Sequence, residues 1–145
     1  MEKMMHRRLF LKGLGLIGVA SSIAAPKIAL ADGMLDPMNS NLTGSLFYTM
    51  EAPGRWAGKE AGHVPMIERS GNMIEVTTGH EMDGYTHYII KHILLDENLE
   101  FVAETMFDPQ TDAPISTYDI SGMDTALYMV SLCNKHDAWL NRLAL

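Results

Sequence analysis

The sequence predicts an all-β domain folded as an antiparallel β-sandwich. Seven short stretches rich in β-branched and aromatic residues follow one another along the chain, and turn-forming residues separate them. No stretch after residue 31 carries a long helical period. Because the loops of a sandwich gather at its two ends, polar side chains that lie far apart in the sequence can meet there.

The predicted strands cover residues 45–50, 64–68, 73–78, 86–95, 100–107, 115–120 and 126–132. The second and third flank Ser70-Gly71-Asn72, a tight-turn signal that predicts a hairpin. The fourth is a long run rich in Ile, Tyr and Leu, and a turn at 96–98 separates it from the fifth. The sixth alternates apolar and polar residues, and the seventh ends just before Cys133. Residues 139–145 are expected to form one terminal helical turn.

The first 31 residues are typical of an export signal. Arg7 and Arg8 form a twin-arginine pattern, an apolar run covers 13–25, and Ala29-Leu30-Ala31 matches a cleavage site. A retained membrane anchor is the alternative, but this run is shorter than the roughly 20 residues that span a bilayer. We therefore expect a twin-arginine signal peptide at 1–31, a periplasmic location, an extended lead-in at 32–44 and one domain at 45–145.

Removal of this signal makes the chain strongly acidic. Residues 1–31 hold five of the 11 basic residues and one of the 18 acidic residues, which leaves six against 17 and a net charge of −11. Such a charge argues against binding to nucleic acid or, once the signal is cleaved, to an anionic membrane.

Cys133 is the only cysteine of the chain, so no internal disulfide can protect it in an oxidising compartment. His136 follows three residues later, and a tight loop can direct a thiolate and an imidazole at one metal ion. His63, His80 and His87 also fall at the ends of predicted strands, where loops converge. His92 lies inside a predicted strand, and we interpret it as a structural residue.

Other chemistries were weighed for the same residues. A Cys133 nucleophile activated by a histidine would serve a hydrolase or a sulfur carrier, but it leaves three histidines unexplained. Covalent haem attachment needs a Cys-x-x-Cys-His motif, which is absent. The scattered methionines could suggest copper, yet they lack Met-x-x-Met spacing and fit core packing better.

Three segments of the chain resemble the superoxide reductase family, which includes the neelaredoxin and desulfoferrodoxin iron domains. They are HVPMIE from His63, HEM from His80 with HYI from His87, and CNKH from Cys133 followed by Trp139. Each motif alone is weak, but the three occur in the family's order, and the resemblance covers most of the chain after the signal, from about Trp56 to Trp139.

The resemblance implies an immunoglobulin-like, seven-stranded antiparallel β-sandwich that holds one iron ion, cycling between Fe²⁺ and Fe³⁺. Its ligands would be four equatorial imidazoles and one axial thiolate: His63, His80, His87, His136 and Cys133. Backbone N–H groups of Lys135 and His136 are the implied hydrogen-bond donors to the sulfur. The implied activity is one-electron reduction of superoxide to hydrogen peroxide.

The chain departs from the family where a Glu-Lys pair usually precedes the first histidine. Here Lys59 and Glu60 are reversed and displaced upstream of His63. We expect Lys59 to attract the anionic substrate, with Glu60 as a possible carboxylate ligand and Lys135 as a second source of positive charge. The spacing from His80 to His87 is one residue longer than the family pattern, and Asp83-Gly84 can absorb it in a turn.

A small periplasmic redox protein is the expected electron donor, and a homo-oligomer, either a dimer or a tetramer, is implied by the family. The alternative function is that of a periplasmic iron protein without turnover, an electron carrier or sensor that uses the same site.

Overall fold

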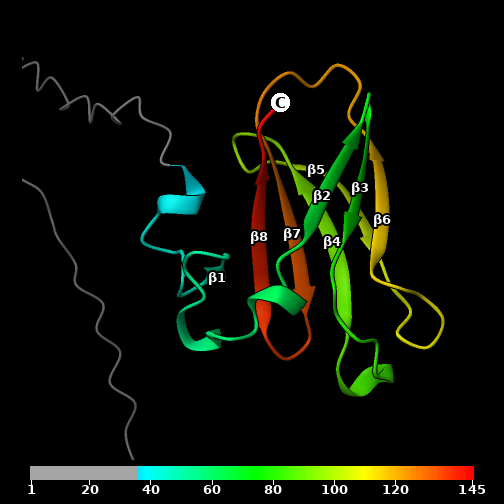
Figure 1. Cartoon of the computed structure of the whole chain (residues 1–145). Helices are drawn as coiled ribbons and strands as arrows, with labels where there is room; N and C mark the ends of the chain where they lie inside the picture. Colours follow the sequence, from blue (N-terminus) through cyan, green and yellow to red (C-terminus); the bar gives the residue numbers. More distant parts are fainter. Residues whose placement is uncertain (1–35) are drawn as a thin grey trace, which may run out of the picture. The chain divides into compact units, whose positions relative to one another are not determined.

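The computed structural model describes residues 36–145, and the predicted β-sandwich is confirmed (Figure 1). Its strands are β1 (Phe47–Tyr48), β2 (Met66–Ser70), β3 (Met73–Thr77), β4 (Ile89–Leu95), β5 (Phe101–Met106), β6 (Ile115–Asp119), β7 (Leu127–Cys133) and β8 (Asp137–Leu143). One sheet has the order β1-β8-β7-β4-β5, and the other has the order β2-β3-β6. The predicted 1–31 signal lies outside the described residues.

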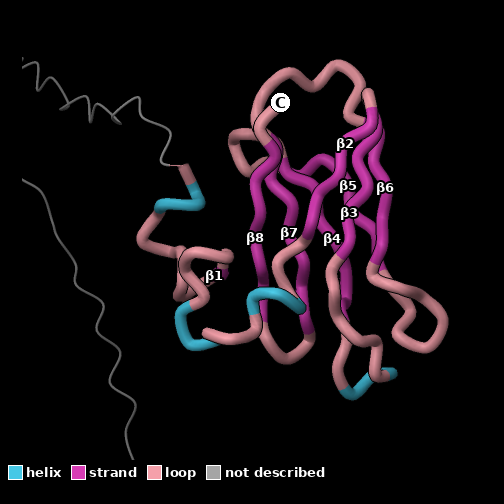
Figure 2. Tube along the Cα trace, in the orientation of Figure 1, coloured by secondary structure: helices cyan, strands magenta, loops and turns pink. Residues whose placement is uncertain are grey.

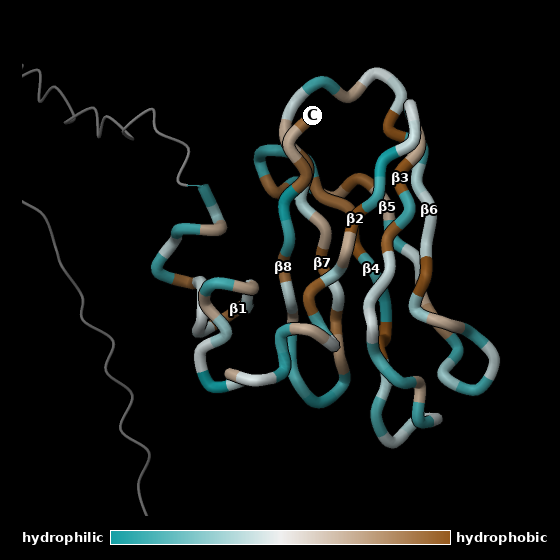
Figure 3. The backbone as a smooth tube through the Cα atoms, in the orientation of Figure 1, coloured by the Kyte–Doolittle hydropathy of each residue, from teal (hydrophilic) through white to brown (hydrophobic). Residues whose placement is uncertain are grey.

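Inward-facing residues of both sheets form the core of the sandwich. The largest cluster joins Ile74 and Val76 of β3 to Leu94 of β4 and Met129 of β7, all almost fully buried. These residues recur at every second position, as the side-chain period of a strand requires. Figure 3 shows hydrophobic stretches along the strands, whereas the loops at the lower end of the view are mostly hydrophilic or neutral.

The C-terminal segment differs from the sequence prediction. Residues 139–145 were expected to form a helical turn, but β8 runs through them and pairs antiparallel with β7. Its residues Trp139 and Leu140 are consecutive and both buried, which hides the alternation that would have indicated a strand. The structure therefore contains eight strands within residues 36–145, one more than predicted.

The N-terminal part of the domain also differs in detail. The predicted strand at 45–50 is only the two-residue β1, and it pairs parallel with β8. Within the predicted extended lead-in, the 3-10 helix η1 covers Pro37–Asn39. Asp36 accepts a hydrogen bond from Tyr128 at 3.2 Å and forms an ion pair with Arg142 at 3.3 Å. From Asp36 onward, this segment is therefore tied to β7 and β8.

Three further 3-10 turns complete the fold: η2 (Gly54–Trp56), η3 (Glu60–Gly62) and η4 (Gly84–Thr86). Figure 2 shows η3 and η4 at the same end of the sandwich as the turn between β7 and β8. In residues 36–145, there is no helix with the length and apolar character needed to cross a membrane.

Candidate metal centre

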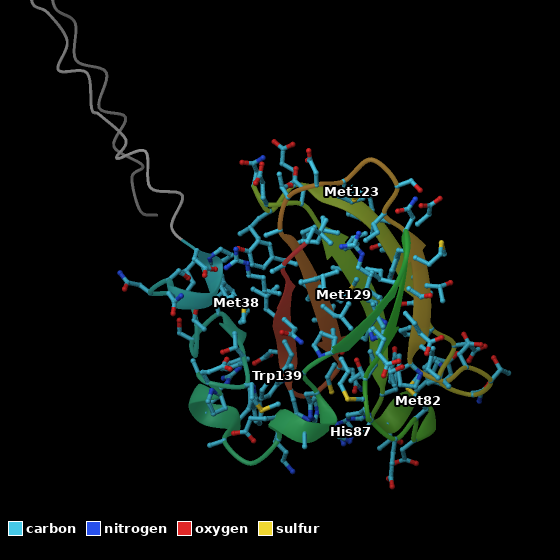
Figure 4. All side chains as sticks on the ribbon, turned by 45° about the horizontal axis from the view of Figure 1, so that its top comes forward. Met38, Met82, His87, Met123, Met129 and Trp139 are labelled. Carbon is cyan, nitrogen blue, oxygen red and sulfur yellow. The ribbon has the colours of Figure 1, made fainter. Side chains whose placement is uncertain are left out.

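Five side chains from three separate parts of the chain meet at this end of the sandwich: the segment between η3 and β2, the β3–β4 connection and the β7–β8 hairpin. They are His63, His80, His87, Cys133 and His136, and one ligand atom from each lies within 4.8 Å of all the others. His63 directly follows η3, His80 follows β3, and His87 follows η4. Cys133 ends β7, and His136 lies in the turn before β8. Figure 4 shows His87 and Met82 at the end of the sandwich opposite Met123.

The β7–β8 hairpin supplies two of the five side chains because its connection is only three residues long. Cys133 pairs with Asp137 across the ladder, which leaves 134–136 as the loop. Asp137 has φ +62°, a left-handed conformation that Asp tolerates and that closes such three-residue turns. The Lys135 N–H group donates to the Cys133 sulfur at 3.4 Å, as the resemblance implied.

The ring nitrogens of the four histidines lie in a regular order. His136 Nδ1 is 2.9 Å from His63 Nε2 and 3.0 Å from His87 Nε2. His87 Nε2 is in turn 3.0 Å from His80 Nε2. The Cys133 sulfur is 3.7 Å from His136 Nδ1 and 3.9 Å from His80 Nε2. Those two nitrogens occupy opposite corners of the order, and the sulfur is nearly equidistant from them.

Backbone carbonyl groups fix which nitrogen of two rings faces the cluster. His63 Nδ1–H donates to the Lys59 carbonyl at 2.8 Å, and His80 Nδ1–H donates to the Glu81 carbonyl. A carbonyl can only accept, so each Nδ1 carries the proton and each Nε2 presents its lone pair to the centre. These bonds hold the two rings in the tautomer that a metal ion requires.

The histidines are held in the neutral form, mainly by burial. Burial lowers the pKa of His63 to about 4, and hydrogen bonding to Lys59 opposes this shift only in part. Burial is also the largest cause that lowers the pKa of His80, His87 and His136. At neutral pH the imidazole lone pairs are therefore free to bind a cation without prior loss of protons.

Asn134 connects the loops that carry Cys133 and His87. Its side-chain oxygen accepts from the Tyr88 N–H at 2.9 Å, and its amide nitrogen donates to the Thr86 carbonyl at 3.2 Å. The longer His80–His87 spacing is accommodated as expected, because Gly84 has φ +50° and Asp83 forms a bridge with His87. This polar clamp fixes His87 relative to the cysteine.

Two tryptophans, Trp56 and Trp139, support His136, and neither could be given a role from the sequence. The buried Trp139 donates its indole N–H to the His136 carbonyl at 2.8 Å. Trp56 lies edge-on to the His136 ring, with ring centroids 4.7 Å apart, and donates to Asp137 at 2.9 Å. Asp137 also pairs with Arg55, and these two partners keep the pKa of its carboxyl below the ordinary value. The only signal in the sequence was that Trp56 and Trp139 mark the two limits of the resemblance to the family.

The donor set fits a single metal ion. Imidazole nitrogens bind transition metals such as zinc at about 2.0–2.1 Å, so two nitrogens at a right angle would lie about 2.9 Å apart. The three neighbouring pairs lie 2.9–3.0 Å apart. Lone pairs directed at one point repel each other unless a proton or a cation lies between them, and a shared cation satisfies all five donors at once.

The charged residues expected near the site have different positions. Lys59 and Lys135 are exposed, and the positive charge of each acts to lower the pKa of both His87 and His136. Glu60 does not join the five side chains. Backbone amides of Glu60 and Gly58 lower the pKa of its carboxyl. The structure thus brings both lysines toward the centre but leaves Glu60 on the η3 turn.

His92 has the structural position expected of it, fully buried between the sheets. Burial lowers its pKa to about 4. Its ring bonds two hydroxyl groups and takes no part in the cluster of five.

The fold was compared with known proteins. No model of a known protein family matches the sequence, and no curated protein matches it. Among solved structures, a variant of the superoxide reductase (neelaredoxin) from Ignicoccus hospitalis is 26% identical with a TM-score of 0.61, over 70% of this chain and 94% of that chain. Another structure of that protein is 25% identical with a TM-score of 0.58, covering 70% and 95%. The superoxide reductase (1Fe-SOR) from Giardia intestinalis is similar in fold, with 24% identity and a TM-score of 0.53, over 59% of this chain and 100% of that chain.

Proposed function

We propose that this protein is a superoxide reductase that holds one iron ion between His63, His80, His87, His136 and Cys133. The convergence of four imidazoles and one cysteine sulfur on a single point is the observation that carries this proposal. The similarity to neelaredoxin structures supports it independently, since 70% of this chain folds as they do, at 25–26% identity.

The number and kind of donors favour iron. Structural zinc sites almost always have four ligands, whereas five protein side chains converge here. Four borderline imidazoles and one soft thiolate suit an ion that cycles between Fe²⁺ and Fe³⁺. The Lys135 N–H bond to the sulfur tunes how strongly the thiolate donates electron density.

A ferrous ion held by these five side chains would supply the one electron that, with two protons from water, reduces superoxide to hydrogen peroxide. The exposure of the five side chains decides from which side superoxide can approach. His80, His87 and His136 are partly exposed, so a small anion can approach on their side, whereas Cys133 is almost fully buried. Burial also argues against a nucleophilic role for Cys133, because a substrate could not reach its sulfur.

Positive charge near the rim offsets the acidity of the chain. Of the six basic residues at positions 36–145, Arg55, Lys91 and Arg142 form ion pairs, whereas Lys59, Lys135 and Arg69 form none with the described residues. Two of these three unpaired cations are the lysines that act on the histidines. We infer that Lys59 and Lys135 attract superoxide over the last several ångströms, within the Debye length of about 8 Å.

The remaining parts of the proposal follow from the sequence. We propose export by the twin-arginine route with cleavage after Ala31, a periplasmic location, a small redox protein as electron donor and a homo-oligomeric state. A role for Glu60 as a ligand of the oxidised ion stays a prediction. An iron protein without turnover, acting as a carrier or sensor, is the second candidate because Glu60 lies apart from the cluster.

Pulse radiolysis of the ferrous protein tests the proposed function. We expect superoxide to oxidise the iron with a rate constant approaching the diffusional ceiling, on the order of 10⁸–10⁹ M⁻¹s⁻¹. The rate should fall as ionic strength rises, because the attraction is electrostatic. An electron carrier or sensor would instead leave superoxide to decay at the rate seen without protein.

Lysine variants test whether Lys59 and Lys135 attract superoxide, and an arginine variant serves as their control. Lys59→Ala and Lys135→Ala should each lower the rate constant by about two- to threefold at low salt, the effect of one unit charge near the Debye length. Arg69→Ala removes a cation that lies on the β2–β3 hairpin, outside the three segments that carry the five side chains, and should leave the rate unchanged. Equal rates in all three variants would show that neither lysine attracts the substrate.

A further inference from the structure

Four polar side chains form a chain of hydrogen bonds inside the apolar core. His92 Nε2 lies 2.8 Å from the Thr78 hydroxyl, which lies 3.0 Å from the Ser131 hydroxyl. On the other side of the ring, His92 Nδ1 lies 2.7 Å from the Ser116 hydroxyl. His92 and Ser131 are 0% exposed, Thr78 2% and Ser116 5%. Polar groups this deeply buried are costly unless every partner is present.

The four groups satisfy one another with a single arrangement of protons. Thr78 donates to Ser131, so its oxygen is left to accept from His92 Nε2–H. His92 Nδ1 then carries a lone pair and accepts from the Ser116 hydroxyl. One nitrogen of His92 must donate and the other must accept, so the imidazole is neutral and no charge is buried.

The positions of these residues relate the hydrogen bonds to the metal centre. Thr78 precedes His80 by two residues, and Ser131 precedes Cys133 by two residues on the same face of β7. His92 pairs with Ser131 across the β4–β7 ladder and lies on the strand that follows His87. Thr78 comes from the end of β3, in the three-stranded sheet, whereas His92 and Ser131 belong to the five-stranded sheet.

We propose that His92 is a positioning residue of the metal centre, which holds Thr78 against Ser131 and thereby sets His80 relative to Cys133. Apolar packing is not directional and would allow the two sheets to shift relative to each other, whereas a hydrogen-bonded chain fixes both register and separation. The quantity that it fixes is the separation of the Cys133 sulfur and His80 Nε2, which is 3.9 Å. The proposal rests on the five side chains forming a metal site and does not depend on their reaction with superoxide.

Titration of the metal-free protein with Co²⁺ tests this role, because the visible bands of Co²⁺ report both affinity and ligand geometry. Thr78→Val keeps the shape of the side chain but removes the hydroxyl that joins His92 to Ser131. We expect Co²⁺ to bind about 10-fold more weakly, the low end of the effect of losing a direct partner of a metal ligand, because the hydroxyl acts on His80 and Cys133 only through the backbone. The band pattern should change as well. Thr78→Ser restores the hydroxyl and should restore both affinity and spectrum.

Ile74→Val is the matched control. Ile74 faces the core from the same strand and the same side, four residues or roughly 13 Å from Thr78. The Ile74→Val substitution should lower the stability of the fold without changing the affinity for Co²⁺ or the Co²⁺ spectrum. The proposal is overturned if Thr78→Val binds Co²⁺ as the unchanged protein does, or if Ile74→Val weakens binding equally at matched stability. Neither result bears on superoxide, whose reaction is measured separately.

Discussion

Replacement of Cys133 by serine should abolish the visible absorption of the ferric protein and lower its affinity for iron by at least about 100-fold. The absorption arises when charge moves from a thiolate sulfur to the ferric ion, and Cys133 is the only cysteine. A serine hydroxyl is a harder and far weaker donor than a thiolate, so it cannot replace the sulfur as a ligand. Visible spectra and iron analysis of the purified variant measure both effects.

Two controls separate ligand loss from misfolding. Serine is close to cysteine in size and can still accept the Lys135 N–H bond, so the metal-free variant should unfold at nearly the same denaturant concentration as the unchanged protein. Met82→Leu removes another sulfur that packs in the same small cluster as Cys133, and it should keep the band. Retention of the band in Cys133→Ser would contradict the assignment of Cys133 as a ligand of the iron.

Acid should destabilise the metal-free protein strongly between pH 6.5 and pH 4. The pKa of His92 is lowered to about 4 by burial, whereas the ordinary value is 6.5. Between these pH values the unfolded state binds the proton and the folded state does not. Stability is therefore fully present above pH 6.5 and falls as the pH drops toward 4, by about 3 kcal/mol for this one residue. Denaturant titrations at several pH values measure the slope.

His92→Gln isolates this contribution. Glutamine can still donate to Thr78 but does not titrate, so the variant should lose the part of the slope that belongs to His92. His63, whose pKa is also lowered to about 4, is present in both proteins and cancels in the difference. The same slope in both proteins would show that His92 already carries its proton in the folded state or that the fold opens around it.

The strands of this protein could be predicted where one face of a strand is buried and the other is not. β3 and β6 alternate clearly, and both were identified with nearly correct bounds. β8 was missed because Trp139 and Leu140, two consecutive residues, are both buried. Their burial follows from the short β1 and its loops, which cover the sheet beside β8. A parallel contact between residues some 90 positions apart leaves no local pattern in the sequence.

The candidate metal ligands could be predicted because each lies in a short motif at the end of a strand. Their second layer of contacts could not. Trp56 approaches His136 only after two segments far apart in the sequence fold together. Asp137 contacts both Arg55 and Trp56 across the same separation in the sequence. His92 could be recognised as structural from its place within a strand, but its partners come from three other strands or strand ends and only the fold reveals them.

The most direct test of the central claim is the product of one reaction. Ferrous protein is mixed without oxygen with a limited amount of superoxide, and hydrogen peroxide, dioxygen and oxidised iron are measured together. We expect one hydrogen peroxide and one ferric ion for each superoxide consumed, with no dioxygen formed. Release of dioxygen, or loss of superoxide while the iron stays ferrous, would contradict the proposal that these five side chains hold an iron ion for the reduction of superoxide.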